Sequence, residues 1–327
     1  MSLETVQRLL MGAWATQSTF LVARLGLPDL LLGGPRRVGE LAGAVDGDPD
    51  ALRRLCRAAA TVGLLTEVDG DRYALTDAGR LLAADTPGSM RAQALAFGTP
   101  VNWRLCGDLG RAVSTGRSTA AEVLGGSLWD YYARHPDEGE LFSQAMGEQS
   151  ARAAADVAAA VTLAGSERIA DIGGAHGDLL TALLAQAPDA TGVLVDLPPV
   201  IESARARLTG TRVEPWPGDF FAAVPSADLY LLKWILHDWD DERAIRILAN
   251  CRRAAASGAR LLVVEMLVPE PWRPSPVHLY DLAMLVLLGS RERTAEEYAA
   301  LLDAAGWRLG EVTATRGAYS VLQACTV

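Results

Sequence analysis

A glycine-rich turn and an acid that follows it are the residues whose types and spacing most directly suggest chemistry. The apolar run 168–172 leads into GGAHG at 173–177, and Asp196 ends the next apolar run, 23 residues after Gly173. Ligands of parallel sheets bind at the carboxyl ends of strands, and an acid about 20 residues on can accept ribose hydroxyls. The pattern predicts a nucleoside-containing cofactor and leaves a dinucleotide and S-adenosylmethionine open. Its ordinary alternative is a tight turn that needs glycine for steric reasons.

Two later strand ends add polar and aromatic residues to the same edge of the expected sheet. The third strand ends at Gly218-Asp219-Phe220, which offers an acid for an adenine amino group beside an aromatic ring. An ordinary turn with a core phenylalanine explains that tripeptide equally well. The fourth strand ends in KWILHDWDD at 233–241, a segment with one lysine, one histidine and three acids.

These segments together carry a family resemblance. DIGGAHG, VLVDLPPVI, GDFF, LLKWILHDWDDERAIRIL, LLVVEMLVP and DLAMLVLLGSRERTAEEYAALLDAAGW occur in this order. The set resembles the plant caffeic-acid-type O-methyltransferases and, equally, the bacterial natural-product O-methyltransferases. The resemblance covers essentially the whole chain, because the N-terminal segment is similar to that family's dimerisation domain. It implies transfer of a methyl group from S-adenosylmethionine to a hydroxyl of a small aromatic molecule.

The resemblance also implies roles for individual residues. Gly173 would pass the methionine part of the cofactor and Asp196 its ribose, while the adenine would be surrounded by Asp219, Phe220 and Trp234. Lys233 and Ser150 would reach polar groups of the cofactor. Met146 and Met284 match methionines that clamp a flat substrate, which thioether–ring contacts make reasonable. The expected contacts of the substrate are Trp103, Met146, Asp238, Asp281 and Met284.

By the same resemblance His237 matches the catalytic base, and Glu265 and Glu292 match two acids that flank it. The chemistry is reasonable, because a phenol with a pKa near 10 reacts well only as its proton leaves. A neutral imidazole is a suitable base, and a neighbouring carboxylate fixes its tautomer. The mechanism requires no metal, and none of the four histidines stands at a metal-ligand spacing from another.

Several readings stay open. His237 could be a polar contact, the two glutamates could cap helices or pair with Arg291 and Arg293, and the methionines could be core. Ala175 stands where the family commonly has glycine. Some relatives do not methylate and use the cofactor as an aid to hydroxylation, decarboxylation or cyclisation. A winged-helix regulator that senses a ligand is the alternative from another class, although a sensor needs no base.

The elements that must position these residues fall into three segments. Residues 1–90 predict a mainly helical winged-helix dimerisation domain, with a helix from Asp48-Pro49 to Gly63 and a hairpin around Asp69-Gly70. An earlier helix is expected to end at Leu27-Pro28. Residues 91–160 predict a helical connector that lines the substrate site. Residues 161–327 alternate strands and helices, which predicts a doubly wound, Rossmann-like α/β sheet with an antiparallel hairpin at one edge.

Charge and composition limit the partners. From Arg36 to Arg80 seven arginines face eight acids, and the net charge of the chain is −10, so neither the wing nor the whole chain suits nucleic acid. No apolar run is long enough for a bilayer, and no secretory signal begins the chain. The four cysteines lie far apart, as free thiols of a reducing, cytoplasmic compartment do. The N-terminal apolar residues exceed what a small domain can bury, which predicts a homodimer (Leu9, Leu10, Trp14, Phe20 and Leu21).

Overall fold

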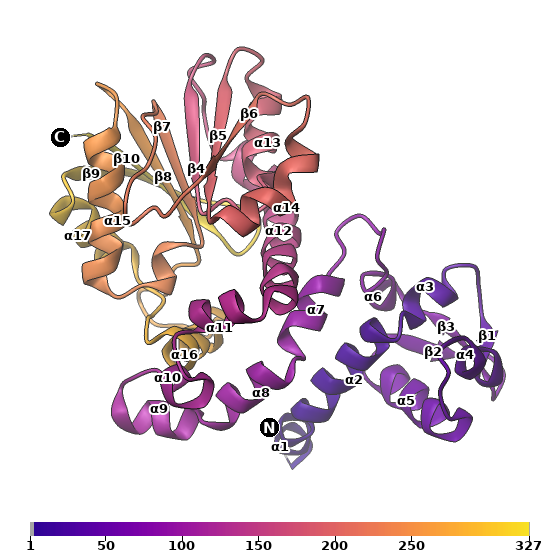
Figure 1. Ribbon diagram of the computed structural model, residues 1–327. Helices are drawn as coiled ribbons and strands as arrows, with labels where there is room; N and C mark the ends of the chain where they lie inside the picture. The colour runs from indigo at the N-terminus through magenta and orange to yellow at the C-terminus, as the bar shows by residue number, and fades with distance from the viewer. Residues whose placement is uncertain (1–2, 327) are drawn as a thin grey trace. The chain divides into compact units, whose positions relative to one another are not determined.

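A computed structural model describes residues 3–326 and divides the chain into two compact units (Figure 1). The first unit ends at Trp103 and the second begins at Arg104. We describe each unit by itself. Within residues 3–326 no helix combines the length and the apolar character that a membrane crossing requires.

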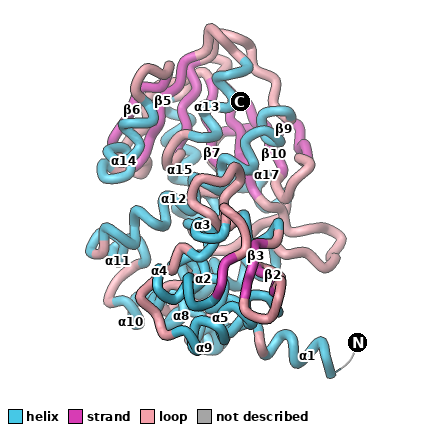
Figure 2. The backbone as a smooth tube through the Cα atoms, turned by 90° about the vertical axis from the view of Figure 1, so that its right-hand side faces the viewer, coloured by secondary structure: helices cyan, strands magenta, loops and turns pink. Residues whose placement is uncertain are grey.

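The first unit packs helices around a small sheet. Strands β2 (Leu65–Glu67) and β3 (Arg72–Leu75) form the predicted hairpin, and β1 (Arg36–Arg37) pairs with β3 on its other side (Figure 2). The helices are α1 (Leu3–Leu10), α2 (Gly12–Arg24), α3 (Leu27–Leu31), α4 (Val38–Ala44), α5 (Pro49–Thr61), α6 (Asp77–Arg80) and α7 (Arg91–Phe97). This arrangement confirms the helical, winged-helix-like domain.

Local signals explain the helix limits of this unit. The Asp48 side chain accepts a hydrogen bond of 2.8 Å from the amide of Ala51 and so caps α5, with Pro49 in the first turn. The prediction for Leu27-Pro28 was wrong, because α2 already ends at Arg24 and the proline lies in the first turn of α3. A proline fits that position because its missing N–H has no partner there.

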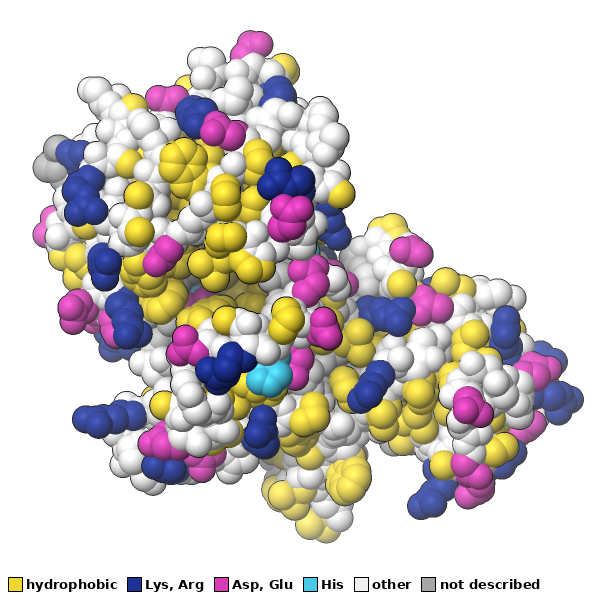
Figure 3. Space-filling model, viewed as in Figure 1, with side chains coloured by type: hydrophobic (Ala, Val, Ile, Leu, Met, Phe, Trp, Pro, Cys, Tyr) yellow, Lys and Arg dark blue, Asp and Glu magenta, His cyan; other side chains and the backbone are white. Residues whose placement is uncertain are grey.

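The N-terminal end of the chain carries exposed apolar side chains. Phe20 was wrongly counted among them, because it is buried within the first unit. Yellow side chains gather at the lower tip of the view in Figure 3. The side chains of α1 and its surroundings that are more than half exposed are Leu3, Val6, Leu9, Leu10, Met11 and Trp14. A surface of this kind marks an interaction site.

Helices open the second unit, as the sequence predicts. Helix α8 (Pro100–Gly107) crosses the boundary between the two units. It is followed by α9 (Leu109–Thr115), α10 (Ala120–Leu124), α11 (Leu128–Arg134) and the long α12 (Pro136–Ala159). A second group of helices comes after α12 and alternates with the strands, namely α13 (Asp178–Gln186), α14 (Pro198–Leu208), α15 (Asp241–Ala254), α16 (Val277–Leu288) and α17 (Ala295–Ala304).

A seven-stranded sheet forms the centre of this unit, with the order β6-β5-β4-β7-β8-β10-β9. The first five strands of that order are parallel, and β10 is antiparallel to both of its neighbours. This confirms the doubly wound sheet and its antiparallel edge hairpin. The bounds are β4 (Arg168–Ile172), β5 (Thr191–Asp196), β6 (Val213–Pro217), β7 (Leu229–Lys233), β8 (Arg260–Glu265), β9 (Trp307–Ala314) and β10 (Ser320–Thr326).

Side-chain alternation along the strands builds two cores. Ile169 of β4 packs with α12, α13 and α14 on one face, whereas Ala170 and Ile172 pack with α15 and α17 on the other (Figure 1). Trp307 is fully buried on the second face, where its indole N–H donates to the carbonyl of Leu248 at 3.0 Å. Because β4 to β8 are parallel, the residues that follow them meet at one edge of the sheet.

Candidate active site

The turn after β4 holds a glycine that no other residue could replace without rearrangement. Gly173 has a φ of +69°, in the left-handed region, and a Cβ atom built on it would lie 2.5 Å from Cδ1 of Ile235. The same Cβ would lie 3.6 Å from Cε1 of Phe220, so Phe220 comes close to this turn. The structure therefore brings the ends of β4, β6 and β7 together.

Asp196, the last residue of β5, is fixed by the backbone. Its Oδ1 accepts a hydrogen bond of 2.8 Å from the amide of Leu197, and its Oδ2 accepts one of 2.9 Å from the amide of Ala175. Burial raises the pKa of Asp196 to about 6, and the two amides act in the opposite direction. Each carboxylate oxygen keeps lone pairs for a further donor.

Ala175 has a backbone conformation that favours glycine. Its φ is +51°, a left-handed conformation that costs an L-residue about 1–2 kcal/mol. The amide that binds Asp196 is the amide of this strained residue. The turn therefore accepts an alanine here at the cost of backbone strain, and the hydrogen bond to Asp196 is present.

Asp219 and Phe220 lie where β6 ends. The exposed Asp219 accepts a hydrogen bond of 2.8 Å from the amide of Phe221 through its Oδ1, as a turn residue does. The Phe220 ring packs against Phe221 and Trp239, with centroid distances of 5.0 and 6.1 Å. These contacts fit the ordinary-turn reading, and the closeness of Phe220 to Gly173 fits the cofactor reading.

Lys233 is the last residue of β7, and Trp234 follows it. The Lys233 ammonium lies 5.4 Å from the ring of Trp234 and 5.0 Å from that of Tyr319. Burial lowers the pKa of Lys233 to about 8, although Glu265 and Asp171 oppose the shift. Trp234 has a left-handed φ of +57°, and within residues 3–326 its buried indole N–H has no hydrogen-bond partner.

His237 lies in a single turn of 3₁₀-helix (Leu236–Asp238) directly after β7, and it is 3% exposed. Its Nδ1 is 2.8 Å from Oε1 of Glu292, and its Nε2 is 3.3 Å from Oδ1 of Asp238. The ring stacks on Trp234 at a centroid distance of 4.9 Å and an angle of 25°. Two residues that are 55 positions apart in the chain therefore form one buried hydrogen bond.

Glu265 and Glu292 are both buried beside the imidazole. Glu265 Oε1 accepts a hydrogen bond of 3.1 Å from the amide of Leu236, so this acid does cap the short helix that carries His237. The amide of Glu292 donates to Oδ1 of Asp281 at 2.9 Å. In the part of the chain that is described, Oε2 of each glutamate lacks a hydrogen-bond partner.

The buried acids set the proton affinity of this centre. Burial alone lowers the pKa of His237, but Asp238, Glu265 and Glu292 outweigh it and raise the pKa to about 9. Burial raises the pKa of Glu265 to about 7 and that of Asp238 to about 6. The imidazole is therefore a stronger base than the carboxylates of Glu265 and Asp238.

The same cluster has a geometry that the sequence spacing does not reveal. Ligand atoms of His237, Glu265 and Glu292 lie within 4.8 Å of one another, a grouping that could hold a metal ion. In this cluster His237 Nδ1 and Glu292 Oε1 already share a hydrogen bond, and a metal that binds these two atoms would compete with it. A shared proton accounts for the cluster without a metal.

Two cavities lie near these residues. One of about 550 Å³ is lined by Asp238 and by the rings of Trp129, Phe221 and Trp239. The rings of Trp129 and Trp239 stack at 6.1 Å and 26°, so one wall is flat and aromatic. The second cavity, of about 400 Å³, is lined by Asp281 among others. Of the expected substrate contacts, Asp238 and Asp281 thus border open space.

Four further residues with predicted contacts, three to the substrate and Ser150 to the cofactor, do not line these two cavities. Met146 and Ser150 are on α12, where Met146 is partly buried and packs against the core of that face. Met284 is buried on α16. Trp103 belongs to the first unit. Roles for these four residues remain predictions.

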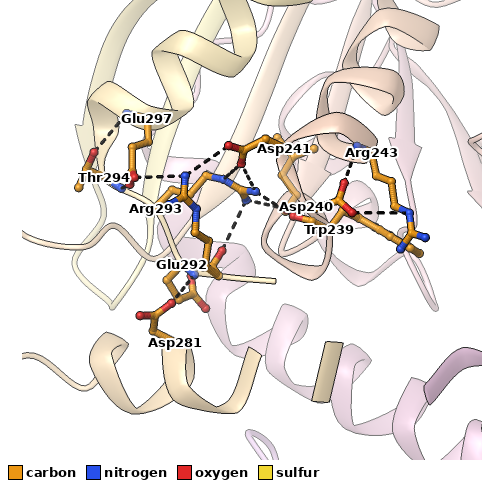
Figure 4. A network of polar contacts seen from close by, with 11 residues as sticks. Trp239, Asp240, Asp241, Arg243, Asp281, Glu292, Arg293, Thr294 and Glu297 are labelled. Carbon is orange, nitrogen blue, oxygen red and sulfur yellow. Dashed lines mark hydrogen bonds and ion pairs between the residues drawn. The ribbon is translucent and has the colours of Figure 1, made fainter. Parts of the chain in front are cut away.

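The sequence left an ion pair of Arg293 with Glu265 or Glu292 as one open alternative, and Arg293 has a different partner. Its side chain is fully buried and binds Asp241 at 2.7 Å, and none of its described ion pairs is with Glu265 or Glu292 (Figure 4). The sequence signal for a role of Arg293 was its position directly after the candidate glutamate in SRERT. The arginine follows Glu292 directly, and its side chain binds the carbonyls of Leu236 and Trp239 in the segment that carries His237.

Comparison with known proteins agrees with this geometry. Residues 106–308 match the O-methyltransferase domain and residues 7–85 the O-methyltransferase dimerisation domain. The chain belongs to this O-methyltransferase family. It is an enzyme that uses S-adenosylmethionine as its cofactor.

Characterised relatives include the phenazine O-methyltransferase of Lysobacter antibioticus, which is 37% identical over 97% of this chain and 94% of the relative. The mitomycin biosynthesis 6-O-methyltransferase of Streptomyces lavendulae is 39% identical over 94% and 89%. A solved structure of human N-acetylserotonin methyltransferase with S-adenosylmethionine superposes with a TM-score of 0.92. The two sequences are 28% identical, and the superposition covers 99% of this chain and 97% of the human protein chain.

Proposed function

We propose that this enzyme methylates a phenolic hydroxyl of a small, flat aromatic molecule, with His237 as the general base. One observation carries the proposal, namely the buried hydrogen bond of 2.8 Å between Nδ1 of His237 and Glu292. A carboxylate at Nδ1 favours the tautomer whose Nε2 carries a lone pair and can accept a proton. Asp238, which lies 3.3 Å from that Nε2, lines the aromatic cavity of about 550 Å³.

The residues of the centre divide the work of proton transfer. His237 takes the proton of the acceptor hydroxyl, and Glu292 holds the ring in one tautomer and stabilises the imidazolium that forms. A phenol has a pKa near 10, which is close to the value of about 9 for His237, so the transfer is nearly balanced. Glu265 acts as a positioning residue, because it binds the backbone amide next to the histidine.

We assign the cofactor to residues at or after the neighbouring strand ends, together with Ser150 of α12. Support comes from the Gly173 turn, from the fixed carboxylate of Asp196 and from the unpartnered indole N–H of the buried Trp234. When bound, S-adenosylmethionine supplies an electrophilic methyl group on a sulfonium. The full set that we assign to it is Ser150, Gly173, Asp196, Asp219, Phe220, Lys233 and Trp234.

The acceptor is inferred to be aromatic from the cavity and from the relatives. Trp129 and Trp239 offer a stacked wall, and a flat ring gains most from such a surface. Known relatives are named for phenazine and for 3-amino-4-hydroxybenzoate, and a solved neighbour holds 2-hydroxy-5-methyl naphthoic acid. We assign acceptor contacts to Trp103, Met146, Asp238, Asp281 and Met284.

A nitrogen acceptor is the second candidate. The 8-amino-8-demethylriboflavin N,N-dimethyltransferase of Streptomyces davaonensis is 37% identical over 93% of this chain and 90% of its own. An aromatic amine attacks with its lone pair and needs no base beforehand. The buried His237–Glu292 pair therefore favours oxygen, and parallel assays with matched phenols and anilines distinguish the two.

We further propose that the enzyme works as a cytoplasmic homodimer. The dimerisation domain and the exposed apolar side chains of α1 support the dimer, and four free cysteines fit a reducing compartment. Light scattering should give about twice the chain mass of 34.7 kDa. A stable monomer contradicts the dimer.

Product analysis tests the proposed function. The protein is incubated with S-adenosylmethionine and a panel of phenols, and the products are resolved by mass spectrometry. We expect one added methyl group per turnover and an equal amount of S-adenosylhomocysteine. Conversion of an acceptor without S-adenosylhomocysteine would instead show a non-methylating relative, and ligand binding with no conversion would favour a sensor.

A further inference from the structure

Two arginines flank Glu292, and they differ in burial. The side chain of Arg291 is half exposed, whereas that of Arg293 is completely buried. Both reach Asp241, Arg291 at 3.3 Å and Arg293 at 2.7 Å. Burying a guanidinium costs free energy, so its contacts must offset that cost.

The Arg293 guanidinium binds three points of the segment that carries His237. Its Nη1 donates to the carbonyl of Leu236 at 3.0 Å, and its Nη2 donates to the carbonyl of Trp239 at 2.8 Å. Its Nε and Nη2 both donate to Oδ1 of Asp241, at 3.0 and 2.7 Å (Figure 4). One planar group therefore spans residues 236–241 on both sides of the histidine.

The backbone of Arg293 is anchored independently of this segment. Its carbonyl accepts a hydrogen bond of 3.0 Å from the amide of Val268, just after β8. The guanidinium also lies 5.9 Å from the ring of the fully buried Tyr298. The residue thus joins the His237 segment to the part of the chain that supplies Glu292.

We propose that Arg293 is a positioning residue that holds the 236–241 segment so that Nδ1 of His237 meets Glu292. The inference rests on the proposed function, because it assigns a task to the same base. Arg293 follows Glu292 directly in the chain. Its side chain therefore fixes the position of the 236–241 segment, and with it His237, relative to Glu292. A lysine cannot replace it, because a single ammonium cannot reach three separate acceptors in a planar fork.

The test compares Arg293→Lys with the matched control Arg291→Lys, two residues away and also paired with Asp241. Misplacement of a reacting group by about 1 Å costs up to about 100-fold in rate. We expect Arg293→Lys to lower kcat at least about tenfold with little change in KM for S-adenosylmethionine. Its rate-against-pH curve should also begin to rise at a lower pH, because His237 loses its carboxylate partner. Arg291→Lys should stay within about twofold.

A double mutant separates positioning from general destabilisation. If Arg293 acts through His237, adding Arg293→Lys to His237→Gln should cause no further loss of kcat. Circular dichroism and the melting temperature check the fold, and Asp241→Asn provides a second variant that weakens the same clamp if Arg293→Lys does not fold. That variant should lower kcat and move the pH profile in the same direction.

Three results overturn the inference. The first is a kcat of folded Arg293→Lys equal to that of the parent, and the second is an unchanged pH profile of Asp241→Asn. The third is an equal fractional loss of kcat when Arg293→Lys is introduced into the parent and into His237→Gln. Parental turnover of His237→Gln would be a different result, because it contradicts the proposed base itself.

Discussion

At the ends of β4 and β5, Asp196 is held by backbone amides of Ala175 and Leu197, both within 21 residues of it. After the end of β7, His237 is held by the carboxylate of Glu292, which is 55 residues away in the chain and follows α16. The first region uses backbone geometry and one strained alanine, and the second uses charge. Substitutions should therefore act on cofactor binding in the first region and on turnover in the second.

The largest effect is expected at His237. His237→Gln removes the base but keeps a hydrogen-bonding side chain, so turnover should fall by about 10²–10⁴, the usual contribution of general-base catalysis. The dissociation constant of S-adenosylmethionine, measured by calorimetry, should change less than about threefold. Turnover within threefold of the parent would remove His237 from its role.

Loss of Glu292, the carboxylate partner of His237, should cause the second-largest fall in turnover. Glu292→Gln keeps an acceptor for Nδ1–H but removes the charge that stabilises the imidazolium, an interaction of about 1.5–3 kcal/mol, so turnover should fall about 10–100-fold.

The pH dependence of this variant has a definite sign. In the parent the pKa of His237 is raised to about 9, so the imidazole is neutral only above that pH and the rate should rise towards it. Without the negative charge the pKa falls, and the rise in kcat/KM should move to lower pH. Glu297→Gln, which removes a partly exposed helix-capping acid, is the control and should leave the profile in place. An unmoved profile in Glu292→Gln refutes the electrostatic account.

Cofactor binding should respond to the loss of Asp196 in the first region. Asp196→Ala removes a fixed acceptor for the ribose hydroxyls, so S-adenosylmethionine should bind at least about tenfold more weakly by calorimetry. Asp189→Ala removes an exposed acid before β5 and should have no effect. Equal affinity of Asp196→Ala and the parent would show that the ribose is held elsewhere.

The smallest effect is expected at the strained alanine. Ala175→Gly relieves a left-handed conformation at φ +51°, so the protein should gain about 1 kcal/mol of stability. Affinity for the cofactor should stay within about twofold, because the backbone N–H is retained. Ala182→Gly in the middle of α13 should instead destabilise the protein by about 1 kcal/mol. A lower melting temperature for Ala175→Gly contradicts the strain.

The fold follows closely from local sequence signals. Asp48 and Pro49 start α5 as predicted, and the closing strands β9 and β10 pair antiparallel, because caps, turns and alternation act over a few residues. The site is less readable. The sequence suggests His237 and Glu292, but which atoms meet depends on contacts that form only when β7 and the segment after α16 come together.

Two residues show where sequence reasoning stops. Ala175 is visible in the sequence as a departure from glycine, yet only the φ of +51° shows its physical reason. Pairing of Arg293 with a glutamate was one alternative that the sequence left open, whereas Arg293 binds Asp241 and two carbonyls. Competition among several acids for one buried cation is decided by three-dimensional packing.

The acidity of the acceptor tests the central claim most directly. Transfer rates of the parent and of His237→Gln are measured on a series of phenols that differ in pKa but have similar shape. A weakly acidic phenol depends on the base, whereas a strongly acidic one is already ionised near pH 8. The account predicts a loss of about 10²–10⁴ for the weakest acid and a loss below about tenfold for the strongest. Equal losses across the series would contradict proton removal by His237.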